Sequence, residues 1–152
     1  MSTTGHIDMK SRRTSASRRI AASPEAVFDL LTDASKHELI DGSGTVQGVL
    51  KEPERLTLGS KFGMDMKLSL LPYRISSTVV EFEENQLIAW QHFGKHRWRY
   101  ELEPIEEGTL VTETFDWSTS IAPKFIELAG YPEKHLPNIE RTLERLAEVL
   151  EE

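Results

Sequence analysis

The chain has 152 residues, of which 38% are hydrophobic and 28% are charged, a composition typical of one globular domain rather than a disordered chain. It contains no cysteine, which excludes disulfides, thiolate nucleophiles and cysteine-based metal sites. No apolar run approaches the ~20 residues of a membrane-spanning helix, and the polar N-terminus has no signal-peptide pattern. We therefore expect a cytoplasmic protein without stable membrane insertion.

The net charge of −7 is unevenly distributed along the chain. Residues 1–19 carry a net charge of +4, so the remainder carries −11. An acidic body argues against a nucleic-acid partner, because phosphate contacts need a basic face. Since the first residues are also polar and show no apolar period, we interpret residues 1–13 as a disordered tail and residues 14–152 as a single domain.

The first half of the predicted domain begins with a strand over residues 15–22. Ser23 and Pro24 form a strong helix start, because serine caps a helix and proline suits its first position. A second short helix is expected over residues 33–38. A polar loop with two glycines follows at residues 41–45, which we interpret as a lid or entrance loop. Strands are then expected at residues 46–51 and 61–70, the second with strict alternation.

The second half is expected to contain four more strands, a short helix and a long C-terminal helix. The strands are predicted at residues 75–83, 87–93, 97–103 and 110–117, and the short helix at residues 123–128. The long helix spans residues 133–151, and its apolar stripe consists of Leu136, Ile139, Leu143, Leu146 and Leu150. This order predicts an α+β fold in which a curved antiparallel sheet of six or seven strands surrounds the C-terminal helix.

Several strings resemble the START-like superfamily, also called SRPBCC, in its polyketide cyclase/dehydrase and lipid-transport branch. The strings are ASPEAVF (22–28), LTD (31–33), DGSGT (41–45), AW (89–90), WRYELEP (98–104) and GTLVTET (108–114). The resemblance covers about residues 15–150 and implies the Bet v 1-like helix-grip fold, with a deep cavity under the C-terminal helix. It does not select a function, because one fold serves many functions.

The last two strands suggest a buried polar site. The simplest register pairs Leu102–Val111, Tyr100–Glu113 and Trp98–Phe115 on one face, and Arg97–Asp116 and Arg99–Thr114 on the other. This register buries Glu113, and a buried carboxylate needs a partner or a raised pKa. We interpret Glu113 as a ligand anchor or general base, with Tyr100 as its donor. The alternatives are a strand-end carboxylate that reaches solvent, or a register slip of one residue.

A second candidate polar group is His92. We expect it to share a face of the sheet with Ile88 and Trp90, and with Thr78, Val80 and Phe82 of the neighbouring strand. His92 could bind a ligand or transfer protons; alternatively, it is a structural histidine near a strand end. It lies across a hairpin turn from His96, without a metal-ligating motif, so we expect neither a metal nor a cofactor. The expected ligand-binding residues are Phe62, Met64, Met66, Trp90, Trp98, Tyr100, Glu113 and Trp117.

Three functions are compatible with these features. The first is binding of an apolar small molecule, lipid or polyketide-like, in the cavity. The second is a cyclase or dehydratase in which Glu113, Tyr100 and His92 are the candidate catalytic residues. The third is a protein-interaction module, which we rank last because no sequence feature marks an exposed apolar patch. The sequence is compatible with a homodimer without determining the oligomeric state.

Overall fold

The computed structural model describes residues 3–40, 46–49, 55–68 and 71–151. The strands are β1 (Thr4–Asp8), β2 (Arg13–Ile20), β3 (Val46–Val49), β4 (Lys61–Leu68), β5 (Leu71–Glu83), β6 (Leu87–Gln91), β7 (Arg97–Ile105) and β8 (Gly108–Asp116). The helices are α1 (Pro24–Leu31), the 3₁₀ helix η1 (Ala34–Lys36), α2 (His37–Ile40), α3 (Pro123–Leu128) and α4 (Tyr131–Leu150). The expected loop at residues 41–45 lies outside the described residues.

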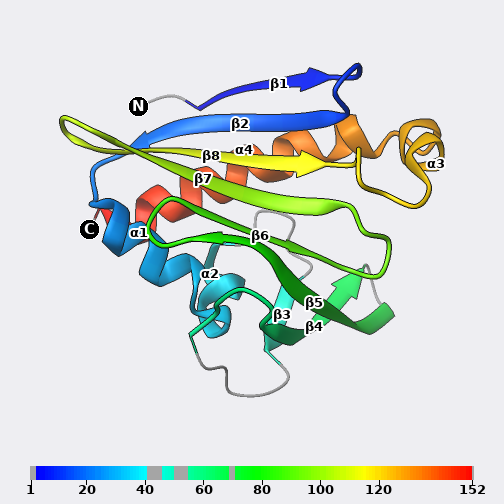
Figure 1. Ribbon diagram of the computed structural model, residues 1–152, viewed down its shortest axis with the longest axis horizontal. Helices are drawn as coiled ribbons and strands as arrows, with labels where there is room; N and C mark the ends of the chain where they lie inside the picture. Colours follow the sequence, from blue (N-terminus) through cyan, green and yellow to red (C-terminus); the bar gives the residue numbers. More distant parts are fainter. Residues whose placement is uncertain (1–2, 41–45, 50–54, 69–70, 152) are drawn as a thin grey trace.

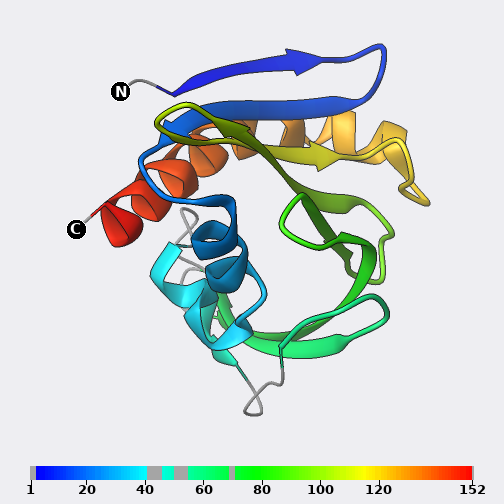
Figure 2. The same ribbon diagram turned by 60° about the vertical axis from the view of Figure 1, so that its left-hand side comes forward.

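The strands form one curved sheet with the order β1-β2-β8-β7-β6-β5-β4-β3, antiparallel throughout. Helix α4 crosses the inner face and packs on β2, β1 and β8 (Figure 1). Figure 2 shows the sheet bending away from α4 toward β3, with α1 and α2 beside its curved half. The predicted α+β helix-grip fold is therefore confirmed.

An eighth strand arises from the N-terminal segment, where we had expected a disordered tail over residues 1–13; residues 4–8 form β1 instead. Strand β1 pairs with β2 along its whole length, with Gly5 opposite Ala16. A Cβ atom on Gly5 would lie 2.8 Å from Cδ1 of Leu136 in α4, so glycine lets this edge strand approach the helix. Backbone pairing and the packing of Ile7 against the core stabilise a segment whose sequence shows no apolar period.

The helices form for the reasons that the sequence suggested. Ser23 caps α1, since its Oγ accepts a hydrogen bond from the backbone N–H of Ala26 at 3.2 Å. Helix α4 begins two residues earlier than predicted, directly after Gly130, whose φ of 75° ends α3 and turns the chain. The stripe residues Leu143 and Leu146 are fully buried, which fixes α4 against the sheet.

The β7–β8 hairpin has the predicted register. Tyr100 lies opposite Glu113 and Trp98 opposite Phe115, and the outer-face pairs also agree. Gly108, the first residue of β8 after the turn, has a φ of 149°, and a Cβ atom there would lie 2.1 Å from the carbonyl oxygen of Ile20. Only glycine allows the hairpin to approach β2 this closely.

The β5–β6 pairing differs from the prediction because β5 contains a bulge. Val79 lies opposite Trp90, but the next pair is Glu81 with Ala89, so Val80 is the extra residue. As a result Ser77 and Val79 are buried on the inner face, whereas Thr78 and Val80, which we had placed there, are half-buried.

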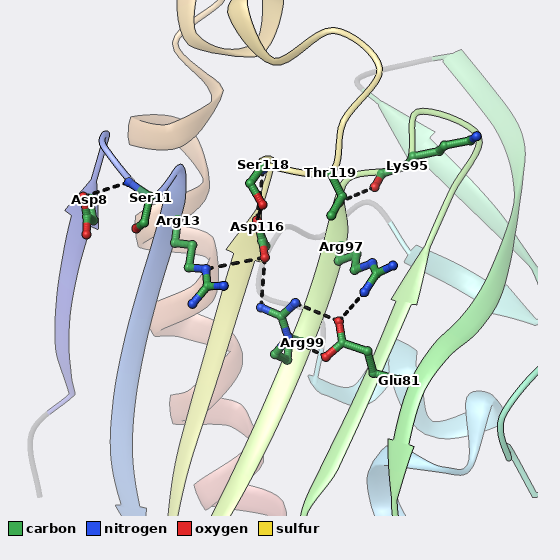
Figure 3. Close-up of polar contacts among 10 residues, drawn as sticks. All are labelled: Asp8, Ser11, Arg13, Glu81, Lys95, Arg97, Arg99, Asp116, Ser118 and Thr119. Carbon is green, nitrogen blue, oxygen red and sulfur yellow. Dashed lines mark hydrogen bonds and ion pairs between the residues drawn. The ribbon is translucent and has the colours of Figure 1, made fainter.

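The bulge also places Glu81 on the outer face, within an ion-pair network (Figure 3). Arg97 and Arg99 each donate to Glu81 at 2.7 Å, and Arg99 donates to Asp116 at 3.1 Å. The hydrogen bond from Arg99 is the main reason that the pKa of Glu81 falls to about 2, against the opposing effect of burial. The network links β5, β7 and β8 on the face away from α4, with Arg13 of β2 3.5 Å from Asp116.

Candidate functional site

The inner face of the sheet is lined by buried apolar and aromatic side chains. On β6 and β7 these include Ile88, Trp90, Tyr100 and Leu102, and on β8 Val111 and Phe115. They face inward because residues two apart on a strand share one face. Few polar groups interrupt this surface, and the residues that do are the candidates for recognition or chemistry.

The first group of interest joins α2 to β4 and β6, and we call it the His37 cluster (His37, Phe62 and Trp90). The His37 ring stacks on Trp90 with centroids 4.9 Å apart and meets the Phe62 ring edge-on at 5.5 Å. Nε2 of His37 lies 2.9 Å from the Leu31 carbonyl oxygen, within hydrogen-bond distance. The cluster reaches β7 through Tyr100, whose ring is 5.5 Å from that of Trp90.

The second group, the His135 cluster, consists of His96, Trp98, Phe115, Tyr131 and His135. His135 lies in the first turns of α4. The centroid of its ring is 4.5 Å from that of the Phe115 ring and 5.0 Å from that of the Trp98 ring. Tyr131, one turn earlier, stacks on His135 at 5.5 Å. The centroid of the His96 ring lies 5.3 Å from that of the Phe115 ring. An imidazole from the helix and one from a hairpin turn therefore meet the same phenyl ring.

The pKa values of three imidazoles in this region, those of His92, His96 and His135, are lowered, which favours their neutral form. Burial lowers the pKa of His92 to about 4, repulsion from His96 adds to the effect, and a hydrogen bond to the Ser76 backbone opposes it. Burial likewise lowers the pKa of His135 to about 4, helped by His96 and Lys134, and lowers that of His96. Nδ1 of His92 lies 2.7 Å from Oγ of Ser77, which orients the ring from β5.

Glu113 and Tyr100 lie opposite each other on β8 and β7, two residues along the strands from the Trp98–Phe115 pair. Glu113 is 4% exposed and its Cα partners are Ala16 of β2 and Tyr100 of β7. The expectation that its side chain faces the interior is thus met, and neither the register slip nor the solvent-exposed alternative holds. Whether Glu113 anchors a ligand or acts as a base stays a prediction, as does the role of Tyr100.

Most of the expected ligand-binding residues share this inner face. Phe62, Trp90 and Trp98 line it together with Tyr100 and Glu113. Trp117 follows the end of β8 and is fully buried, and its Nε1 donates to Oε2 of Glu127 in α3 at 2.8 Å. That bond directs the indole N–H toward α3 rather than toward the polar groups of the sheet. The side chains of Met64 and Met66 lie outside the described part of the structure.

Four residues that complete the site were not predicted from the sequence: His37, Ser77, His96 and His135. His135 had a signal, since it precedes the buried Ile139 by four residues and so belongs to the inward stripe of α4. The inward orientation of Ser77 depends on the bulge in β5, which the sequence did not predict. In residues 3–40, 46–49, 55–68 and 71–151, no three histidine, aspartate or glutamate side chains form a group that could hold a metal ion.

Such an interior suits a mostly apolar molecule with a few polar atoms. Neutral imidazoles and a phenol can exchange hydrogen bonds with hydroxyl or carbonyl groups, while the surrounding rings contact the apolar part. No helix in the described part of the chain is long and apolar enough to cross a membrane.

Comparison with known proteins agrees with this architecture. The family model described as polyketide cyclase/dehydrase and lipid transport matches residues 11–151. The chain belongs to this family. One similar solved structure is that of the Polyketide_cyc-like protein Cgl2372 of Corynebacterium glutamicum, which is 25% identical to this chain. The two structures superpose with a TM-score of 0.63, and the match covers 93% of this chain and 92% of Cgl2372.

Two further relatives extend the comparison. The uncharacterised protein Rv0088 of Mycobacterium tuberculosis is 40% identical over 153 residues, which cover 97% of this chain and 68% of that protein. Protein Ms6760 of Mycobacterium smegmatis has a TM-score of 0.72 at 13% identity, covering 97% of this chain and 96% of its own. The latter likeness concerns the fold alone.

Proposed function

We propose that the chain binds an apolar small molecule, lipid or polyketide-like, between the inner face of the sheet and α4. The observation that carries this proposal is the set of neutral histidines, His92, His96 and His135, placed among buried aromatic rings. A core that served only stability would gain more from apolar side chains, because buried polar groups cost free energy unless they are satisfied. Membership of a family that includes lipid transport supports the same function.

The composition of this surface defines the ligand more closely. Trp90 and Trp98 offer ring faces to an apolar skeleton. His92 and His135, both neutral, favour uncharged partners such as hydroxyl and carbonyl groups over charged ones. An anionic group would lose its hydration in this apolar interior, so neutral polyketides and lipid alcohols or ketones should bind better than fatty acids.

Two measurements test the proposal. Native mass spectrometry of freshly purified protein should reveal a non-covalent adduct that disappears under denaturing conditions. Titration with neutral apolar probes should change tryptophan fluorescence saturably. Glu113→Gln should weaken binding of hydroxylated probes, whereas the matched control Glu101→Gln should not, because Glu101 is exposed on the outer face of the same hairpin. A bare chain mass with no saturable response across apolar probes would contradict the proposal.

A second candidate function is a cyclase or dehydratase that uses the same surface. The observation that favours it is the placement of Glu113 opposite Tyr100, with a neutral imidazole at His92 on the same face. A carboxylate can take a proton from a carbon beside a ketone, and a phenol can protonate a departing hydroxyl, which leaves as water. Incubation with β-hydroxy-ketone thioester mimics should then give products lighter by one water, and Glu113→Gln should abolish this loss. Saturable binding of these compounds without any turnover would contradict the cyclase or dehydratase function and would support binding only.

A further inference from the structure

One end of the molecule exposes large apolar side chains, contrary to the expectation that no such patch exists. Phe93 is 87% exposed, Ile121 68%, Phe125 64% and Leu128 89%. We call these four residues the terminal patch. They come from the β6–β7 turn, from the segment after β8 and from α3, which lie at the right-hand end of the molecule in Figure 1.

Hydrogen bonds join the segments that carry the patch. The backbone N–H of Ile121 donates to the carbonyl oxygen of Gly94 at 3.1 Å, and Oγ1 of Thr119 donates to that of Lys95 at 2.6 Å. These bonds hold the β6–β7 turn, and with it Phe93, against the segment that leads into α3.

Helix α3 presents apolar side chains on two sides. Ile126 is buried against the core, whereas Phe125 and Leu128, three residues apart, share the exposed side. Glu127 fixes this orientation, because its Oε2 accepts hydrogen bonds from Nε1 of Trp117 at 2.8 Å and from Nε of Arg12 at 3.0 Å. The contacts of Glu127 with Arg12 and Trp117 thus keep the apolar side of α3 facing outward.

The charge around the terminal patch is opposite to that of the remaining protein. Three stretches of the chain meet at this end of the molecule: residues 8–13, 93–95 and 117–134. Together they contain six basic side chains and three acidic ones, a net charge of +3. Because the whole chain carries −7, the remainder carries −10. Lys95 and Lys124 are exposed beside the patch.

We propose that the terminal patch docks on the surface of an anionic lipid bilayer. Its apolar side chains would enter the boundary between headgroups and acyl chains, and the surrounding lysines would contact lipid phosphates. A symmetric dimer through this surface is disfavoured, since it would bring two faces of net charge +3 together. The acidic remainder is repelled from an anionic surface, which orients the protein with this end toward the bilayer.

Docking in this orientation brings the candidate site close to the lipid. Tyr131, 39% exposed, follows α3 closely and stacks on His135 at 5.5 Å. The His135 cluster is therefore one aromatic ring away from the surface of this end. Docking is independent of the proposed function, because the patch and its charge exist whether or not the interior binds a ligand.

Co-sedimentation with large vesicles tests the proposal. The protein should bind vesicles of phosphatidylcholine with about 30% phosphatidylglycerol, bind pure phosphatidylcholine weakly, and dissociate at high salt. The double variant F125S/L128S should lower the affinity at least about tenfold, because two large apolar side chains no longer enter the bilayer. The matched control Leu39→Ser removes a leucine that is 55% exposed on α2 and should bind like the wild type.

Three results would overturn the proposal. These are absence of binding to the anionic vesicles, equal binding by wild type and F125S/L128S, and a concentration-dependent dimer in analytical ultracentrifugation that the double variant dissociates. The last result would assign the patch to a protein contact instead. Thermal melts should be unchanged in the double variant, because both side chains are exposed, so a loss of vesicle binding will not reflect unfolding.

Discussion

Acid should destabilise the protein through its buried histidines. The pKa of His92 and that of His135 are each about 4 in the folded state, against 6.5 for an unperturbed histidine. Between these values the unfolded chain binds more protons than the folded one, so stability falls as pH drops from 6.5 toward 4 and is unaffected above that range. At pH 5 each of the two histidines lowers the free energy of unfolding by about 2 kcal/mol relative to its value above about pH 6.5. The two losses are not strictly additive, because both rings interact with His96.

The variant His135→Phe isolates one of these contributions. Phenylalanine keeps an aromatic ring against Phe115 and Trp98 but cannot take up a proton. Urea unfolding at about pH 7.5 and about pH 5 should show a wild-type stability difference that shrinks by about 2 kcal/mol in this variant. The control His6→Phe replaces an exposed histidine of β1 and should leave the difference unchanged. If His135→Phe loses as much stability on acidification as the wild type, His135 accepts its proton without cost and the reasoning is wrong.

Other substitutions test the fold. Leu143→Ala should cost about 2–5 kcal/mol in urea melts, and a loss below about 1 kcal/mol would show that α4 does not bury its stripe. Gly108→Ala should destabilise by at least about 1–2 kcal/mol, because the new Cβ would lie 2.1 Å from the Ile20 carbonyl oxygen; an unchanged melting temperature would contradict this close approach. Glu81→Gln should be less stable than the wild type above pH 4.5, and the difference should vanish as pH falls toward 2, where the wild-type carboxylate also loses its charge. A difference that persists at pH 2 would mean that the ion pair with Arg99 is not its cause.

The register of β7 and β8 could be predicted because both strands alternate. Tyr100 and Glu113 had to meet once aromatic residues were matched on one face and charged residues on the other. The ion pair between Arg97 and Asp116 that this register suggested is not the one that forms. Arg97 lies opposite Asp116 in the register, yet it pairs with Glu81, because the bulge in β5 brings a third strand's carboxylate to the same face.

Alternation fails wherever the backbone departs from regular pairing. The extra residue at Val80 exchanges the inward-facing and outward-facing side chains of β5 on one side of the bulge. No residue type in this segment predicts a bulge. Strand β1 was missed for a different reason. It is an edge strand held by backbone hydrogen bonds to β2, and backbone pairing leaves little trace in side-chain periodicity.

The histidines of the site show the limit of reading each element alone. His92 was found from its strand, but its importance depends on His96 and His135, which approach from a turn and from a helix. His135 is polar, so it was not counted with the leucines of α4. Only the packing of α4 on β8 brings its ring to Phe115.

The most direct test of ligand binding in the interior is the response of the three tryptophan indole signals in an NMR titration with a neutral apolar ligand. Trp90 and Trp98 lie on the inner face, whereas Trp117 is held through its N–H by Glu127. We predict saturable shifts of the Trp90 and Trp98 indole resonances, with a smaller change at Trp117. A titration in which neither the Trp90 nor the Trp98 indole resonance shifts saturably would contradict an interior binding site.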